Sequence, residues 1–382
     1  MRDVRPQMTA APLAPVTPHG EPPRAPEALV PALLQRGDDD WVRCEQDLTA
    51  RGLPHQLLAR SAFVVRRNDV ETKLLVLRDA DGFCWGGLAV HVRPIKGVPG
   101  HCTLHAERFG ASIAPSALEA AARALANVLR RNARALRMDV DVFARDEETR
   151  LAASRALANA GFRNADSNSY VQTLTVDLLP DEDQIFASFS RSARRNVRQI
   201  DKHPLERRLI SDSIYIPRME EITRQTLDRT GGHYAPQDWK GRIEFSNAHP
   251  EMSRIVGVFR ADREGTEALV SFAWGAMHGD HGQYRDGAST RVEWNVALSY
   301  VLIWDMISWA KAQGALWFDL GGVTDGRQGE SDDPLAGISD FKRHFTSRVE
   351  RVGQGFELQA TTLRARAARA LVRARALVRS RR

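Results

Sequence analysis

Hydrophobic residues recur along this chain with two periods, one typical of strands and the other of helices. Alternating or short continuous apolar runs predict strands over residues 62–78, 83–92, 101–107, 136–143, 161–176, 205–210, 255–260, 268–277, 282–288 and 316–320. Apolar residues at spacings of three and four predict helices over 116–132, 147–160, 181–202, 214–229, 236–247 and 294–310, the last of them apolar nearly all round. Runs of strands separated by long helices are typical of an α+β fold.

The length of the chain divides this pattern into two parts. At 382 residues the chain exceeds what a single core usually supports, so we expect an N-terminal domain at 31–177 and a C-terminal domain at 178–360. Eight of the eighteen prolines fall within the first 31 residues, which predicts a disordered Pro/Ala-rich leader over 1–30. Residues 26–60 otherwise read as helix and loop, with Trp41 as an anchor.

The basic character of the chain belongs to its last residues. Leu363–Arg382 contains eight arginines and no acid, so without it the net charge of +6 becomes −2. Its apolar stripe predicts an Arg-rich amphipathic tail over 361–382. Such a helix suits an anionic membrane surface or a phosphate backbone, and a plain surface helix is the alternative.

Composition also bounds the compartment. The three cysteines fit no disulfide framework or metal-ligand spacing, which indicates a reducing compartment. No apolar run approaches the roughly 18 residues that a membrane span needs. We therefore expect a cytoplasmic protein, with the tail available for contact with the inner face of the plasma membrane.

The densest candidate chemistry lies in residues 317–350. A short apolar strand carries Asp319 and is interrupted by Gly321 and Gly322, and a polar loop follows. Phe341 and its neighbours at helical spacing then predict an amphipathic helix that carries Lys342. A strand, a glycine break and a helix holding one cation beside aromatic rings can place a charge at a reaction centre, although ordinary strand–loop–helix units share the pattern.

A second basic feature lies in the helix predicted at 181–202. One side of this helix is apolar, and Arg194, Arg195 and Arg198 lie on the other. Arginine's planar fork suits a phosphate or carboxylate clamp, whereas a solvated helix face is the plainer reading.

Two motifs of the C-terminal half carry a family resemblance. DLGG followed by a loop and GxxxFKxxF resembles the C-terminal signature of the FemABX family, and 284–289, YRDGAS, is similar to that family's Y-x-x-G-A-S strand end. The resemblance implies two tandem GNAT-like domains, each a mixed, mostly antiparallel sheet flanked by helices. It also implies transfer of an aminoacyl group from charged tRNA to an amine on a peptidoglycan or other cell-envelope precursor.

The resemblance also assigns roles to individual residues. Lys342 would be the catalytic cation, and Asp319 would orient the amine or only cap its strand. Tyr284 and Ser289 would face the substrate cleft, with the tyrosine as a core residue in the alternative. The remaining substrate-binding residues it implies are Arg194, Arg195, Arg198, Gly321, Gly322 and Phe341.

Other functions stay open at this stage. No zinc-type cluster, P-loop, GxGxxG or GxSxG motif occurs in the sequence, and the loop that holds the CoA pyrophosphate in GNAT domains has no clean copy, so we expect no cofactor. The first alternative is an acyl-CoA-dependent N-acyltransferase acting on an envelope saccharide, peptide or lipid. The second is a non-catalytic module that binds tRNA or a membrane surface.

Overall fold

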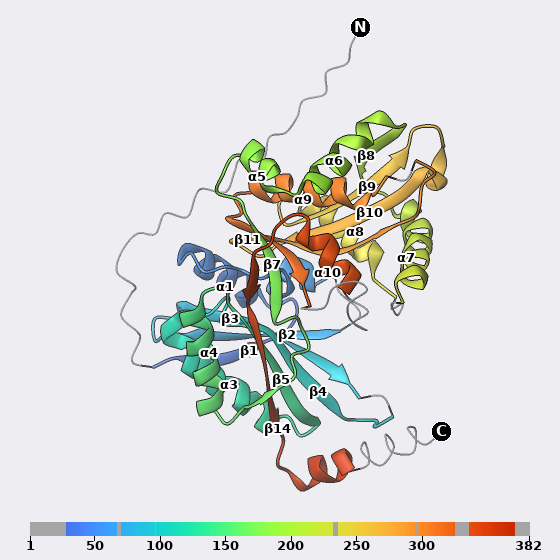
Figure 1. The fold of residues 1–382 in the computed structure, drawn as a ribbon. Helices are drawn as coiled ribbons and strands as arrows, with labels where there is room; N and C mark the ends of the chain where they lie inside the picture. The colour runs from blue at the N-terminus through green and yellow to red at the C-terminus, as the bar shows by residue number, and fades with distance from the viewer. Residues whose placement is uncertain are drawn as a thin grey trace.

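Two seven-stranded sheets, one below the other in Figure 1, organise the protein. The computed structural model describes residues 28–370, apart from 67–69, 96, 232–235, 295 and 325–335. In each sheet one neighbouring pair of strands is parallel and the other pairs are antiparallel. The expected α+β architecture of two mixed, mostly antiparallel sheets flanked by helices is confirmed.

The first sheet forms the lower half in Figure 1. Its order is β1-β2-β3-β4-β5-β14-β6, with β4 and β5 as the parallel pair. Helices α3 and α4 bury their alanine- and leucine-rich faces against one side of this sheet. The elements are β1 (Val30–Leu34), α1 (Asp39–Ala50), α2 (Ser61–Val64), β2 (Glu71–Arg78), β3 (Cys84–Pro94), β4 (Cys102–Phe109), α3 (Leu118–Arg131), β5 (Ala135–Phe143), α4 (Glu147–Asn159), β6 (Arg163–Ala165) and β14 (Gly353–Gln359).

The second sheet has the order β13-β7-β12-β11-β10-β9-β8, with β11 and β12 as the parallel pair. Helix α9 packs against it and is buried nearly all round, as its composition predicts. The elements are β7 (Gln172–Asp177), α5 (Glu182–Ser188), α6 (Arg191–Gln199), β8 (Leu205–Leu209), α7 (Ile216–Thr230), α8 (Trp239–Ala248), β9 (Ser253–Arg260), β10 (Leu269–Met277), β11 (His281–Ser289), α9 (Ser299–Ala312), β12 (Trp317–Gly322), α10 (Ala336–Arg343) and β13 (Val349–Arg351).

The two halves exchange strands, which corrects the expected boundaries at two places. Strand β7, placed by us at the end of the N-terminal domain, pairs with β12 and β13 in the second sheet. Strand β14, placed in the C-terminal domain, pairs with β5 and β6 in the first. The chain therefore crosses between the halves twice. The sequence did not predict these crossings, because hydrophobic alternation identifies a strand without identifying the strands it pairs with.

Three predicted elements also differ in detail. The strand expected over 62–78 begins as helix α2 and becomes β2 only at Glu71, and the helix expected over 181–202 breaks at Phe189 into α5 and α6. Residues 26–60 contain the edge strand β1 in addition to α1, while Trp41 is buried as expected. The leader over 1–30 lies outside the described residues except for its last three.

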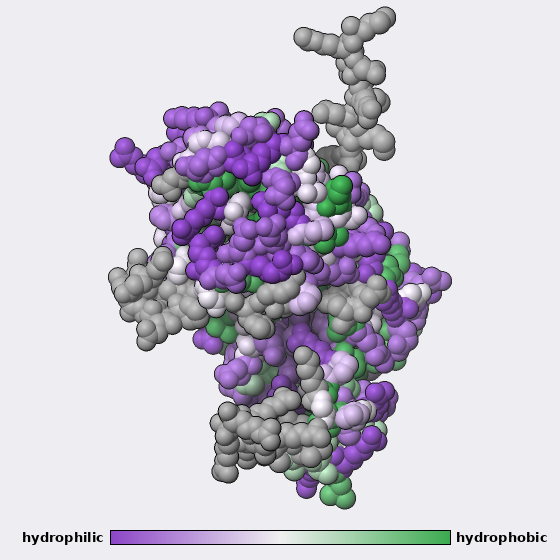
Figure 2. Space-filling model, turned by 90° about the vertical axis from the view of Figure 1, so that its right-hand side faces the viewer, coloured by the Kyte–Doolittle hydropathy of each residue, from purple (hydrophilic) through white to green (hydrophobic). Residues whose placement is uncertain are grey.

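The surface on the face shown in Figure 2 is mainly hydrophilic, with small separate hydrophobic groups. None of the helices that the structure describes has both the length and the hydrophobicity needed to cross a membrane.

The described start of the tail packs against the first half. Residues 363–370 are helical, and Ala365 and Ala368 are buried in the core formed with α3. Arg369 donates to the carbonyls of Leu136 and Ala360 at 3.1 and 2.6 Å. The rest of the predicted amphipathic tail, 371–382, lies outside the described residues.

These contacts predict that the tail contributes to stability. Removing residues 361–382 is expected to lower the free energy of unfolding by about 2 kcal/mol, through lost apolar burial and the lost Arg369 hydrogen bonds. Urea denaturation of this truncation and of one that ends after residue 370 measures the difference. Equal midpoints for the two truncations would contradict the packing.

Candidate active site

An opening between two parallel strands defines the centre of the candidate site. Strands β11 and β12 pair over only three positions, ending at Gln283 opposite Asp319. Beyond that point β11 stays with β10, while β12 shifts register against β7 and turns at Gly321, whose φ is +78°. The two strands therefore separate, and backbone groups near their ends are left for other partners.

Lys342 of α10 lies at this opening. Its Nζ donates to the carbonyl of Gly322 at 2.7 Å, and the residue is only 7% exposed. Burial lowers its pKa to about 8, against the opposing attraction of Asp319. An ammonium has three donors, so two remain for a substrate oxygen.

The other residues that the sequence predicted beside Lys342 mainly position this lysine. A side chain at Gly321 would begin 3.4 Å from Lys342 Nζ, so glycine leaves the cation accessible at that point. Gly322 instead allows close packing, because a Cβ there would meet Tyr170 at 2.6 Å. Phe341 stacks edge-on against Tyr300 and Phe345 and anchors α10 on α9.

Asp319 is fully buried and surrounded by donors. It accepts hydrogen bonds from the hydroxyls of Tyr170 and Thr173 and from the N–H of Gly321 at 2.7 Å, and Gln283 Nε2 lies at 3.3 Å. Its oxygens are thus already occupied. This geometry fits the alternative in which Asp319 fixes the strand end, more closely than direct contact with an amine.

A buried arginine joins this network to the first half. Arg108, at the end of β4, donates to Gln56 Oε1 at 2.9 Å, to His281 Nε2 at 3.1 Å and to Tyr170 at 3.2 Å. Its Nη2 lies 4.0 Å from Asp319, and its guanidinium lies 3.9 Å above the Phe143 ring centroid. Because arginine only donates, His281 must accept at Nε2 and carry its proton on Nδ1, which faces Asp280 at 2.7 Å.

Most of this network gives no recognisable signal in the sequence. Arg108 has a φ of +58°, the only positive value among the described non-glycine residues. Tyr170, Thr173 and Gln283 had no signal beyond strand periodicity.

Tyr284 and Ser289 occupy different environments on β11. Tyr284 is partly buried against the core beneath α9, and burial raises its pKa. Ser289 receives the end of α7: its N–H donates to Thr226 Oγ1 at 3.1 Å, and its carbonyl accepts from Arg229 at 3.2 Å. The backbone of Ser289 thus holds the end of α7 against β11. Tyr284 contributes its backbone carbonyl, which lies next to Gly321.

The three arginines expected to bind substrate on α6 also lie in different environments. Arg194 donates to the carbonyls of Ala187 and Phe189, at the break before α6, and Arg198 lies 5.1 Å from the Phe186 ring centroid. Arg195 is exposed, and its guanidinium forms no hydrogen bond or ion pair with the part of the chain that the structure describes. The start of α6 touches the end of α10, because Ser190 N–H donates to the carbonyl of His344 at 2.9 Å.

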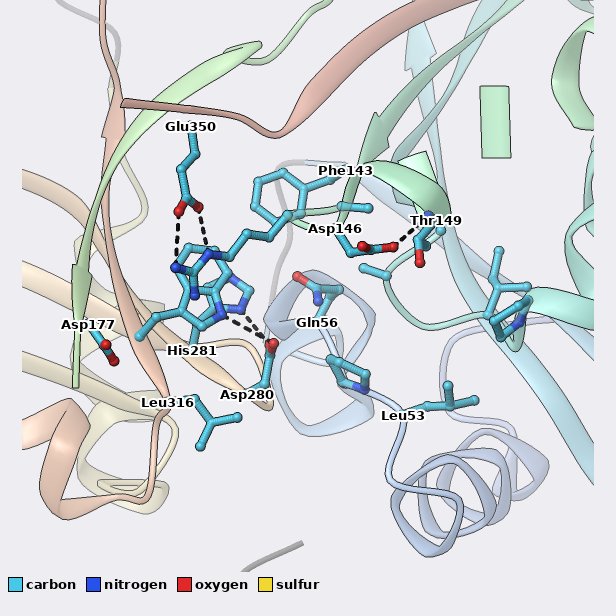
Figure 3. A pocket seen from close by; sticks show the side chains of 18 of the residues that line it. Leu53, Gln56, Phe143, Asp146, Thr149, Asp177, Asp280, His281, Leu316 and Glu350 are labelled. Carbon is cyan, nitrogen blue, oxygen red and sulfur yellow. Dashed lines mark hydrogen bonds and ion pairs between the residues drawn. The ribbon is translucent and has the colours of Figure 1, made fainter. Parts of the chain in front are cut away.

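A separate cavity of about 700 Å³ lies between the halves, at the opposite end of β12 from Lys342. Figure 3 shows its wall formed by Gln56, Phe143, Asp280, His281 and Glu350, among others. Trp317 opens β12 on this side, and Arg108 and Tyr170 stand between the cavity and Asp319. No group of three or more His, Cys, Asp or Glu in the described part of the chain is arranged to hold a metal ion.

Comparisons with known proteins agree with this fold. Residues 295–373, which include β12 and α10, match the FemAB family. The fold is similar to that of FemX, with a TM-score of 0.62 and 16% identity over 76% of this chain and 88% of that chain. It is also similar to L-PGS from Bacillus licheniformis, with a TM-score of 0.53 and 10% identity over 89% of this chain and 97% of that one. Among curated proteins none matches in sequence.

The chain thus shares its two-sheet α+β fold with FemX and L-PGS. The match of its C-terminal part to the FemAB family, together with the FemX fold, confirms the resemblance to the FemABX family.

Proposed function

We propose that the protein transfers an aminoacyl group from charged tRNA to an amine on a cell-envelope precursor. The observation that carries the proposal is the placement of Lys342 between the separating ends of β11 and β12, within the segment that matches the FemAB family. The FemAB match and the resemblance to the FemABX family support an acceptor in the cell envelope, and both the donor and the acceptor belong to the proposal.

The chemistry required is aminolysis of an ester. The acceptor nitrogen forms a C–N bond with the ester carbonyl, a tetrahedral oxyanion develops, and the C–O bond to the ribose breaks as the amine's proton passes to the ribose oxygen. The free N–H groups of Lys342 would face the developing oxyanion in a site that excludes water. A pKa of about 8 also leaves this ammonium near the best range for proton donation at neutral pH.

Helix α6 would hold the donor. Arg191, Arg195 and Arg198 are exposed on this helix, which begins beside the end of α10. Phosphates of the tRNA acceptor stem would contact these guanidiniums while the 3′ end approaches Lys342. Arg194 would keep its place in the turn between α5 and α6.

Transfer of label tests the proposal. The full-length protein is incubated with a tRNA pool charged with labelled amino acids and a fraction of envelope precursors, and the label is followed from tRNA to amide product. We expect transfer that depends on Lys342 and is not competed by acetyl-CoA. Transfer of label only from an acyl-CoA would overturn the donor and favour the first alternative.

The pH profile gives a second expectation. Because the pKa of Lys342 is lowered to about 8, kcat/KM should fall as pH rises through about 8 and the cation is lost. The free energy of unfolding should instead increase with pH in this range. Between about pH 8 and 10.4 the Lys342 amine is protonated in the unfolded chain and neutral in the folded one, so rising pH favours the folded state. Rate measurements paired with thermal unfolding at each pH separate the two effects. A flat rate profile up to pH 9 would contradict the role of the cation.

A further inference from the structure

The cavity between the two halves has an unusual balance of charge. Four carboxylates line it, and its two arginines, Arg145 and Arg348, both pair with one of them, Glu350, at 2.6 Å. In the described part of the chain no lysine or arginine forms an ion pair with the other three, Asp146, Asp177 and Asp280. The cavity therefore favours a cation and disfavours a phosphate.

A buried amide adds a second, independent requirement. Gln56 is 5% exposed and lies in the cavity wall between His281 and Leu53 (Figure 3). Its Oε1 must accept from Arg108, so its orientation is fixed, and its buried Nε2 has no hydrogen-bond partner in the structure. A buried donor without an acceptor costs free energy, which a carbonyl oxygen of a ligand would recover.

The remaining wall is apolar. Ile113, Phe143, Leu179 and Trp317 provide aliphatic and aromatic surface, and the Trp317 indole stacks on the His281 ring at 4.1 Å between centroids. The volume of about 700 Å³ is within the usual range for small-molecule sites. A ligand here would meet carboxylates, the buried Gln56 N–H donor and apolar walls together.

We propose that this cavity binds the amino end of a peptide or amino-acid amide, with its ammonium facing the carboxylates, its carbonyl accepting from Gln56 and its side chain on the apolar wall. The site is separate from Lys342, which does not line the cavity and lies at the opposite end of β12, beside Gly322. It lies between the two halves, so the bound ligand would contact β5 and the Gln56 loop on one side and β7 and β11 on the other. The proposal does not depend on the nature of the acyl donor.

Calorimetry on the full-length protein tests the proposal with three probes. L-leucinamide carries ammonium, carbonyl and side chain, N-acetyl-L-leucinamide lacks the charge, and isoamylamine lacks the carbonyl. We expect L-leucinamide to bind at least 10-fold more tightly than either control. Equal affinity for the uncharged probe, or no binding at millimolar concentration, would overturn the proposal.

Two variants locate the binding. Asp146→Asn with Asp177→Asn removes two charges but keeps the side-chain oxygens that accept from the backbone of Thr149 and Leu179. This double variant should weaken the binding of L-leucinamide at least 10-fold. Gln56→Glu keeps the oxygen for Arg108 but removes the donor, so it should reduce the preference for L-leucinamide over isoamylamine. Lys342→Met should bind L-leucinamide as the wild type does, and a loss of binding there would place the ligand at the reaction centre instead.

Discussion

Replacing Lys342 by methionine is expected to lower the rate of aminoacyl transfer by about 100-fold or more, the size seen when one donor to an oxyanion is removed. The ammonium is a buried cation at the separating ends of β11 and β12, where its Nζ donates to the carbonyl of Gly322. Methionine keeps the length and apolar contacts of the side chain and removes only the charge and donors. Single-turnover transfer from charged tRNA measures the chemical step without product release.

A second lysine offers a matched control for this variant. Lys311 also donates to backbone carbonyls, those of Leu178 and Pro180 at 2.7 and 2.6 Å, but it lies on α9 away from the opening. Lys311→Met should cost stability and leave the single-turnover rate within about twofold. If both variants slow transfer equally, the loss reflects general destabilisation, and Lys342 has no special role.

Changing Asp319 to asparagine is expected to have the largest effect on stability. The carboxylate accepts from Tyr170, Thr173 and the Gly321 N–H and faces the Arg108 guanidinium at 4.0 Å. Asparagine removes the charge and turns one acceptor into a donor, which leaves buried groups without partners. We expect a loss of about 3 kcal/mol in the free energy of unfolding by urea denaturation.

A neighbouring carboxylate provides the comparison. Asp177→Asn lies on the adjacent strand β7, is exposed, and keeps its hydrogen bond to the N–H of Leu179, so it should change stability by less than about 0.5 kcal/mol. If Asp319→Asn is as stable as the wild type but inactive, the carboxylate acts on the substrate and our structural reading of it is wrong.

Local sequence was enough to identify the elements that hold the centre of the site. The apolar run before Gly321 and the aromatic spacing around Lys342 predict β12 and α10, because both signals arise within a few residues of the chain. The signals that predict the burial of Trp41 and the apolar helix α9 also arise within a few residues of the chain. The structure places Lys342 next to the Gly321–Gly322 end of β12, as that motif suggests.

The links between distant segments could not be predicted in this way. Arg108 reaches Gln56, Tyr170 and His281, residues up to 173 positions away, and nothing in their own neighbourhoods specifies these partners. The exchange of β7 and β14 has the same origin, since a strand's alternation fixes its faces and leaves its neighbours open. The cavity could not be predicted for the same reason, because its walls come from distant segments of both halves that only the folded chain brings together.

The most direct test of the central claim is the preference of the protein for charged over uncharged tRNA. Equilibrium binding of both forms is measured for the wild type and for Lys342→Met, in a chain that ends after residue 370 and so lacks five of the tail's arginines while keeping the packed helix. We predict that the wild type binds the charged form more tightly and that the variant loses this preference. Equal binding of the two forms by the wild type would contradict aminoacyl transfer from tRNA and direct the search to acyl-CoA donors.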